Sequence, residues 1–156
     1  MNGGGLLVDT NLLVLFTVGT VNRARIGTFK RTSRYTTKEF ELLRRVLAKF
    51  SKVYTVAHIL AEVSNLTDLP GMELARARRV LKVAISSLDE AEMPSIQAAE
   101  DPLYSSLGLV DAAIGAVARV HNCTVLTDDF DLYVRLSRDL VDVINFRHLR
   151  AQQGRM

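Results

Sequence analysis

The sequence lacks several features that define other classes of protein. It contains one cysteine, no tryptophan and three prolines among 156 residues. The single Cys123 cannot form an internal disulfide, so we expect a buried thiol in a reducing compartment rather than a disulfide-stabilised secreted domain. No apolar run approaches the roughly 18 residues that span a membrane, and no export signal is evident at the start of the chain. We therefore expect a cytoplasmic protein without a membrane partner.

The length and the pattern of apolar residues predict one α/β domain. Short apolar runs predict strands at residues 6–8, 53–56, 124–126 and 141–144, with a short edge strand within 89–93. Amphipathic stretches predict helices at 12–18, 36–50, 72–87, 107–121 and 130–140, and Thr55 is a candidate cap for a further helix that carries Glu62. Because strands alternate with helices, we expect a mostly parallel sheet covered on both faces. The domain is expected to occupy residues 1–150, with a flexible tail at 151–156.

The net charge of +3 is unevenly distributed along the chain. Residues 22–52 contain ten basic and two acidic side chains, a local balance of +8, which leaves −5 for the rest. Residues 19–35 are polar and predict an unpacked loop, and its candidate phosphate-binding residues are Arg23, Arg25, Lys30, Arg31 and Arg34. A basic segment together with an acidic cluster suits a metal-dependent enzyme acting on a polyanion. The alternative is a basic surface that is merely solvated.

Acidic residues recur where predicted strands give way to helices. Asp9 and Asp129 follow strands, whereas Glu62 and Asp111 lie near the starts of helices. Functional groups in a parallel sheet gather at the carboxyl ends of its strands, so these four side chains can converge. Clustered carboxylates in apolar surroundings need a cation, and an oxygen-only ligand set favours Mg²⁺ or Mn²⁺. His58 is a weaker candidate ligand, and the alternative for each acid alone is a helix cap or a surface charge.

Four motifs in order resemble the acidic motifs of PIN domains over almost the whole chain. They are Asp9-Thr10-Asn11 after a strand, Glu62 in a helix, Leu109-Val110-Asp111-Ala112, and Leu126-Thr127-Asp128-Asp129-Phe130-Asp131. The resemblance implies a three-layer α/β/α sandwich with a mostly parallel central sheet. It also implies a Mg²⁺- or Mn²⁺-dependent endoribonuclease, such as the VapC-type toxin of a toxin–antitoxin pair. Its partners would then be an RNA substrate, a small antitoxin and a second copy in a homodimer.

The resemblance also assigns roles to individual residues. It implies that four acids bind metal and act in catalysis: Asp9, Glu62, Asp111 and Asp129. The supporting residues would be Asn11, Thr127, Asp131 and Asp128, with the motif spacing favouring Asp129 as the last ligand without excluding its two neighbours. Whether Glu62 binds metal or orients the attacking water stays open.

Three other functions compete with a toxin nuclease. The long basic segment departs from the shortest toxins, which leaves a housekeeping RNA-processing nuclease as an alternative. A non-catalytic PIN-like scaffold that binds RNA or protein is another. A phosphorylated-aspartate receiver is disfavoured because no lysine follows the last predicted strand.

Overall fold

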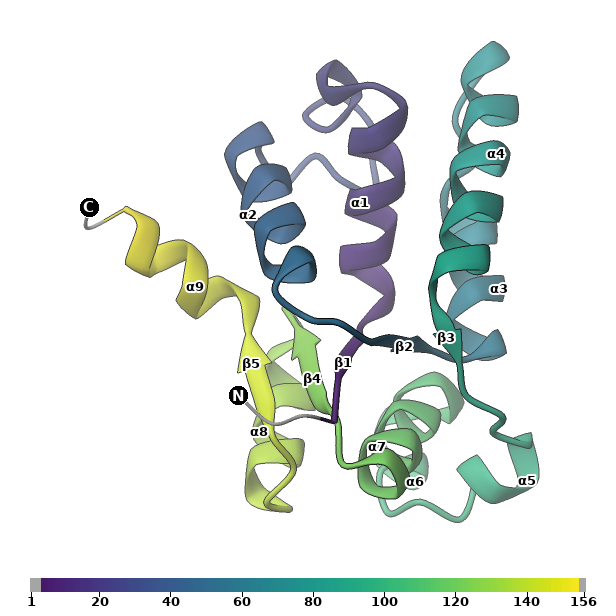
Figure 1. Cartoon of the computed structure of the whole chain (residues 1–156), viewed down its shortest axis with the longest axis vertical. Helices are drawn as coiled ribbons and strands as arrows, with labels where there is room; N and C mark the ends of the chain where they lie inside the picture. Colours follow the sequence, from purple (N-terminus) through teal and green to yellow (C-terminus); the bar gives the residue numbers. More distant parts are fainter. Residues whose placement is uncertain (1–3, 155–156) are drawn as a thin grey trace.

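The central sheet consists of five parallel strands. The computed structural model describes residues 4–154 and places the strands in the order β3-β2-β1-β4-β5 (Figure 1). Their bounds are β1 Leu6–Val8, β2 Val53–Thr55, β3 Asp89–Glu90, β4 Thr124–Thr127 and β5 Val143–Asn145. The central pair aligns Val8 with Leu126, so β1 and β4 end side by side. Leu6, Leu7, Val8, Val125 and Leu126 are fully buried, as expected for strands covered on both faces.

Helices cover both faces of the sheet, which confirms the predicted three-layer sandwich. Helices α1 to α4 lie on one face, and α7 and α8 lie on the other, with the short α5 and α6 beside α7 (Figure 1). The helices are α1 Thr10–Val21, α2 Thr37–Ala48, α3 Ala57–Leu66, α4 Met72–Ser87, α5 Ser95–Ala98, α6 Tyr104–Leu107, α7 Leu109–His121, α8 Phe130–Arg138 and α9 Phe146–Gln153.

Several local predictions are confirmed and several are wrong. Helix α4 has the predicted bounds, and Thr36 caps α2 by accepting a hydrogen bond of 3.3 Å from the Glu39 backbone N–H. The predicted cap Thr55 is wrong, because Val56 occupies the cap position of α3 and the Thr55 hydroxyl is buried in the sheet without a hydrogen-bond partner. The predicted helix 107–121 begins at Leu109, since Gly108 adopts a positive φ of 89° that ends α6.

The carboxyl-terminal part of the chain contains a helix that the sequence did not predict. Helix α9 follows β5 directly and is capped by Asn145, whose side chain accepts a hydrogen bond from the Arg147 N–H. Of the predicted tail at 151–156, residues 151–153 are the last turn of α9, and residues 155 and 156 lie outside the described part of the chain.

The predicted basic loop connects α1 to α2 but is packed rather than loose. A short 3-10 helix spans Arg23–Arg25, and turns follow it. Ile26, Thr32 and Tyr35 are buried, and the Thr32 hydroxyl donates to the Ile26 carbonyl at 2.8 Å. The expectation of an unpacked loop is therefore wrong: a few buried residues spaced among polar ones hold the segment down without any regular period.

Two further expectations concern burial and membranes. Cys123 is a buried free thiol, as predicted, and burial raises its pKa to about 11. Within residues 4–154, none of the helices has both the length and the apolar character required to cross a membrane.

Candidate active site

Asp9 stands at the carboxyl end of the central strand and is held there on both sides. Its backbone N–H donates to the Leu126 carbonyl at 3.0 Å, which continues the pairing of β1 with β4. One carboxylate oxygen accepts from the Thr10 N–H at 2.7 Å and caps α1, and the other accepts from the Thr127 hydroxyl at 2.6 Å. Only 6% of Asp9 is exposed. The carboxylate is thus fixed in position at the edge of the sheet.

Thr127 links Asp9 to Asp129. Besides donating to Asp9, its hydroxyl accepts a hydrogen bond of 3.0 Å from the Asp129 N–H. Asp129 in turn caps α8, because one of its carboxylate oxygens accepts from the Leu132 N–H at 3.2 Å. Thr127 therefore supports the site as predicted, because its one hydroxyl bridges Asp9 at the end of β1 and the Asp129 backbone after β4.

Glu62 and Asp111 reach the same edge from neighbouring helices. Asp111 lies in the first turn of α7, and Glu62 lies in α3, which packs against α7. Burial, together with the negative charges of Asp9, Asp129 and Glu62, raises the pKa of Asp111 to about 7. The four predicted acids consequently share one electrostatic environment.

The pKa of Asp9 is raised for similar reasons. Burial raises its pKa to about 6, although the hydrogen bonds from Thr127 and Thr10 act in the opposite direction. The charges of Asp128 and Asp129 raise it further. Burial, and after it the charges of neighbouring acids, therefore raises the pKa of both Asp9 and Asp111 above the ordinary range of aspartate.

This acidic cluster fits a hard divalent cation. The four side chains offer only oxygen ligands, which Mg²⁺ and Mn²⁺ prefer, and a cation would supply the missing positive charge. In the described chain, no three acidic, histidine or cysteine side chains are close enough together to enclose an ion by themselves. Mg²⁺ commonly takes one or two direct carboxylates and keeps several waters, so the remaining acids would contact it through water.

His58 does not join the acids. Its Nε2 lies 2.9 Å from the Ser95 hydroxyl oxygen, which directs the ring toward α5. The weaker proposal of a histidine ligand is therefore not supported, and the candidate ligand set contains oxygen alone.

Asp128 anchors the basic segment, and its charge also acts on Asp9. One of its oxygens accepts from the Tyr35 hydroxyl in a short hydrogen bond and from the Arg34 guanidinium at 3.0 Å. Burial and the neighbouring Asp128 raise the pKa of Tyr35, and Asp128 also raises that of Arg34 even though burial opposes it. Of the three acids after β4, Asp129 acts on both Asp9 and Asp111 and Asp128 acts on Asp9, whereas Asp131 is exposed in the first turn of α8. Asn11 is half-buried in the first turn of α1.

Most of the predicted phosphate-binding residues already have carboxylate partners. Arg23 pairs with Glu41, Arg25 with Glu73 at 2.5 Å, and Lys30 with Asp68 at 3.9 Å. Arg31 is exposed and has no ion pair within residues 4–154. The basic segment therefore offers less free positive charge than its composition predicts.

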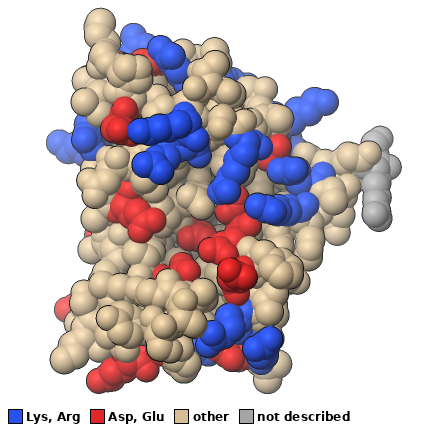
Figure 2. Space-filling model, turned by 180° about the vertical axis from the view of Figure 1, so that it is seen from behind, with Lys and Arg blue, Asp and Glu red and all other residues tan. Residues whose placement is uncertain are grey.

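Two arginines that sequence reasoning missed add charge near Asp128. Arg147 and Arg150 lie on α9, the unpredicted helix, and they line a small pocket together with Arg34. Figure 2 shows acidic side chains gathered in a hollow at the middle of one face, with lysine and arginine side chains in a band above it. The basic residues within 146–150 were the feature of the sequence from which this basic surface could have been predicted.

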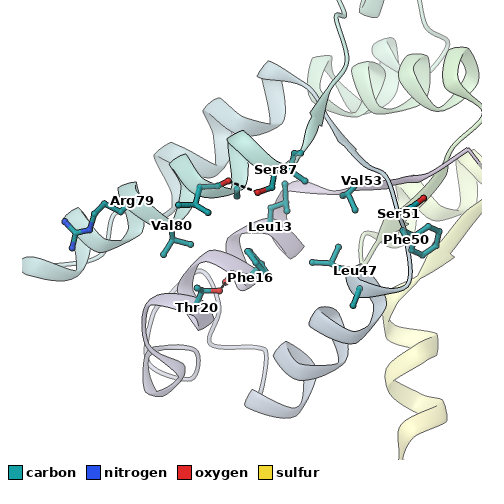
Figure 3. A pocket seen from close by; sticks show the side chains of 14 residues that line it. Leu13, Phe16, Thr20, Leu47, Phe50, Ser51, Val53, Arg79, Val80 and Ser87 are labelled. Atoms are coloured by element: carbon teal, nitrogen blue, oxygen red, sulfur yellow. Dashed lines mark hydrogen bonds between the residues drawn. The ribbon is translucent and has the colours of Figure 1, made fainter.

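A separate apolar groove lies elsewhere on the molecule. It has a volume of about 670 Å³ and lies between α1, α2, α4 and β2 (Figure 3). Apolar side chains dominate its lining, including Leu13, Phe16, Leu47, Phe50, Val80 and Val83. No acidic residue lines it, so it is separate from the carboxylate cluster.

Comparison with known proteins identifies the family and the fold. The profile of the PIN domain family matches residues 6–136, whereas no curated protein gives a significant match. The crystal structure of PAE2754 from Pyrobaculum aerophilum superposes with a TM-score of 0.55 over 97% of this chain and 96% of that chain. The two sequences are 18% identical, so this likeness shows a shared fold. PIN domains are generally metal-dependent nucleases. The chain belongs to the PIN domain family.

Proposed function

We propose that the protein is a Mg²⁺- or Mn²⁺-dependent endoribonuclease that hydrolyses RNA phosphodiesters. The observation that carries the proposal is the Asp9 carboxylate at the end of β1, joined through the Thr127 hydroxyl to Asp129, with Asp111 and Glu62 on adjoining helices. Burial and the charges of the other three acids raise the pKa of Asp111, which agrees with this arrangement. Asp9, Asp111, Asp129 and Glu62 would hold the ion directly or through water. Membership of a family of nucleases supports this use of the acids.

The side chains around the cluster would have separate tasks. A bound divalent ion supplies an activated water and stabilises negative charge on the attacked phosphate. Thr127 and the Thr10 N–H keep the Asp9 carboxylate in one orientation, so the ligand is positioned before substrate arrives. Glu62 either completes the ligand set or accepts the proton of the attacking water. Asn11, in the same helical turn as Thr10, would orient Asp9 or contact a phosphate.

A cleavage assay tests this proposal. We expect the purified protein to cut single-stranded RNA in Mg²⁺ or Mn²⁺ and to stop in EDTA. Asp9→Asn should abolish turnover, whereas Glu92→Gln, which changes an exposed acid outside the cluster, should retain it. The absence of turnover with every RNA offered, or equal activity of the wild type and Asp9→Asn, would leave a non-catalytic RNA-binding scaffold as the better description.

The apolar groove favours a protein partner, as the toxin of a toxin–antitoxin pair requires. Its apolar lining from α1, α2 and α4 suits the apolar face of a partner helix (Figure 3). Val83 is 65% exposed at the groove, so Val83→Glu should weaken antitoxin binding without harming the fold. The matched control is Met72→Glu, on an exposed residue of α4 outside the groove.

Growth measurements decide between a toxin and a housekeeping nuclease. Expression of a toxin should arrest growth, and co-expression of a small antitoxin from the neighbouring gene should relieve the arrest in the wild type but less so in Val83→Glu. Harmless overexpression and no small neighbouring partner gene would favour a housekeeping RNA-processing role in the cytoplasm.

We also propose a homodimer. Large apolar side chains are exposed at Ile96, Val120, Phe130 and Leu140, and an interface that covers some of them would remove this apolar surface from water. Light scattering measures this directly, and a monomeric mass at micromolar concentration would contradict it.

A further inference from the structure

A small basic pocket adjoins the acidic cluster, between the end of the basic segment, the end of β4 and α9. Its volume is about 240 Å³. Three arginines line it, Arg34, Arg147 and Arg150, together with the carboxylates of Asp128 and Glu39. Three positive charges against two negative ones leave the lining at +1. An anionic ligand is thus favoured over a cationic one.

Buried carboxylates hold two of these arginines in place without using all of their donors. Arg34 contacts Asp128 and the Tyr35 hydroxyl through the same terminal nitrogen, and Arg150 contacts Glu39 through one terminal nitrogen at 3.2 Å. Asp128 is 4% exposed and Glu39 6%, so both pairs are shielded on the carboxylate side. The other nitrogens of both guanidinium groups make no hydrogen bond within residues 4–154. These groups are therefore oriented in advance for a further acceptor.

Arg147 supplies the uncompensated charge of the pocket. It lies in the first turn of α9, and its side chain is exposed and forms no ion pair in the described part of the chain. An arginine fork of this kind binds two phosphate oxygens at once. The pocket consequently contains the guanidinium of Arg147, which forms no ion pair in the described chain, beside two guanidinium groups that have some of their hydrogen-bond donors still available.

The location of the pocket relates it to the acidic cluster. Asp128, which contributes to the lining, precedes Asp129 in the chain, and consecutive Cα atoms are about 3.8 Å apart. Asp128 contacts Arg34, and its charge also acts on Asp9, so this residue belongs to both the pocket and the surroundings of the acids. A strand whose phosphate lies at the acids can therefore reach the arginines with a neighbouring phosphate.

We propose that this pocket binds a second phosphate of the RNA strand, next to the phosphate that is cut, with Arg147 as its principal ligand. The inference rests on the proposed function, because the acids define where the strand is cut. A phosphate held here fixes the register of the strand without reading its sequence.

Salt-dependent binding tests the pocket independently of cleavage. Binding of a single-stranded RNA is measured in EDTA, where the acids are without metal, for the wild type, Arg147→Ala and Arg147→Glu. Each phosphate contact contributes about 0.7 to the slope of log affinity against log salt for single strands. We expect both variants to bind more weakly and the slope to fall by about that amount in Arg147→Ala. The matched control Arg138→Ala, at the far end of α8, should keep the wild-type slope.

A scan with one uncharged methylphosphonate linkage at each position of the RNA identifies the occupant. In the wild type, a methylphosphonate at one position should reduce RNA affinity more than at the other positions. In Arg147→Ala, that position should reduce affinity no more than the others do. If both Arg147 variants keep the slope and linkage profile of Arg138→Ala, the pocket does not bind RNA, even where the wild type cleaves RNA in Mg²⁺. If Arg147→Ala lowers the slope of log affinity against log salt but the wild type cleaves no RNA, the pocket is supported and the nuclease proposal is contradicted.

Discussion

Replacing Asp111 by asparagine should stabilise the metal-free protein at neutral and alkaline pH. In the native state, burial and three nearby acids raise the pKa of Asp111 from 3.8 to about 7. A shift of three pKa units corresponds to roughly 4 kcal/mol at about 1.4 kcal/mol per unit. Because Asp111 is partly exposed, screening by water reduces this to about 2 kcal/mol. Asparagine has nearly the same shape and carries no charge, so it removes this penalty.

The direction of the pH dependence follows from which state binds more protons. Between about pH 4 and pH 7 the native state keeps the Asp111 proton while the unfolded chain has lost it, so the free energy of unfolding falls as pH rises. Wild type and Asp111→Asn should therefore be about equally stable at pH 4. At pH 8 in EDTA the variant should be more stable by about 2 kcal/mol.

Urea unfolding at both pH values, with and without Mg²⁺, measures the effect. Mg²⁺ should raise the free energy of unfolding of the wild type at pH 8 and raise that of Asp111→Asn much less, since the ion binds the native carboxylates. Asp131→Asn is the control, because Asp131 is exposed and should change stability by about 0.5 kcal/mol at both pH values. Equal stability of wild type and Asp111→Asn at pH 8 in EDTA would refute the uncompensated negative charge at this site.

Three further substitutions test single contacts. Thr127→Val removes the hydroxyl between Asp9 and the Asp129 N–H, so urea unfolding should show a loss of about 1–2 kcal/mol and the cleavage rate should fall, whereas Thr127→Ser should retain both. Tyr35→Phe removes a donor to buried Asp128 and should cost about 1–3 kcal/mol, while Tyr104→Phe on an exposed ring should be neutral in the same assay. Gly19→Ala places a methyl group 2.4 Å from the buried Phe40 ring and should lower the free energy of unfolding by about 1–3 kcal/mol, unlike Gly27→Ala, which meets no atom within 4 Å. A neutral result for Gly19→Ala would mean that Phe40 has room to move.

The strands, most helices and the cluster of acids were predictable because their signals are local. β1 is a short apolar run followed at once by Asp9, which caps α1, and β4 is followed two residues later by Asp129, which caps α8. Parallel pairing then brings Asp9 beside Thr127 across 118 residues of sequence. Because parallel strands end at the same edge of the sheet, the two acids could be predicted to lie in one site despite their long separation in sequence.

The separation of Asp128 from Asp129 was not predictable from local signals. Both are acids after the same strand, and their roles depend on Tyr35, which is 93 residues away from Asp128 and donates to it. Helix α9 was missed because it follows β5 without a linker, and its cap Asn145 is also the last residue of β5. Consequently the arginines that it contributes beside the acids were absent from the predicted site.

Manganese-soaked crystals test the central claim most directly, because anomalous scattering identifies the ion and its ligands together. We expect an anomalous peak between Asp9 and Asp111, within ligand distance of at least one carboxylate of the cluster, and its loss in crystals of Asp9→Asn. Saturating Mn²⁺ with no peak at these acids would contradict the assignment of this sheet edge as the metal centre of a nuclease.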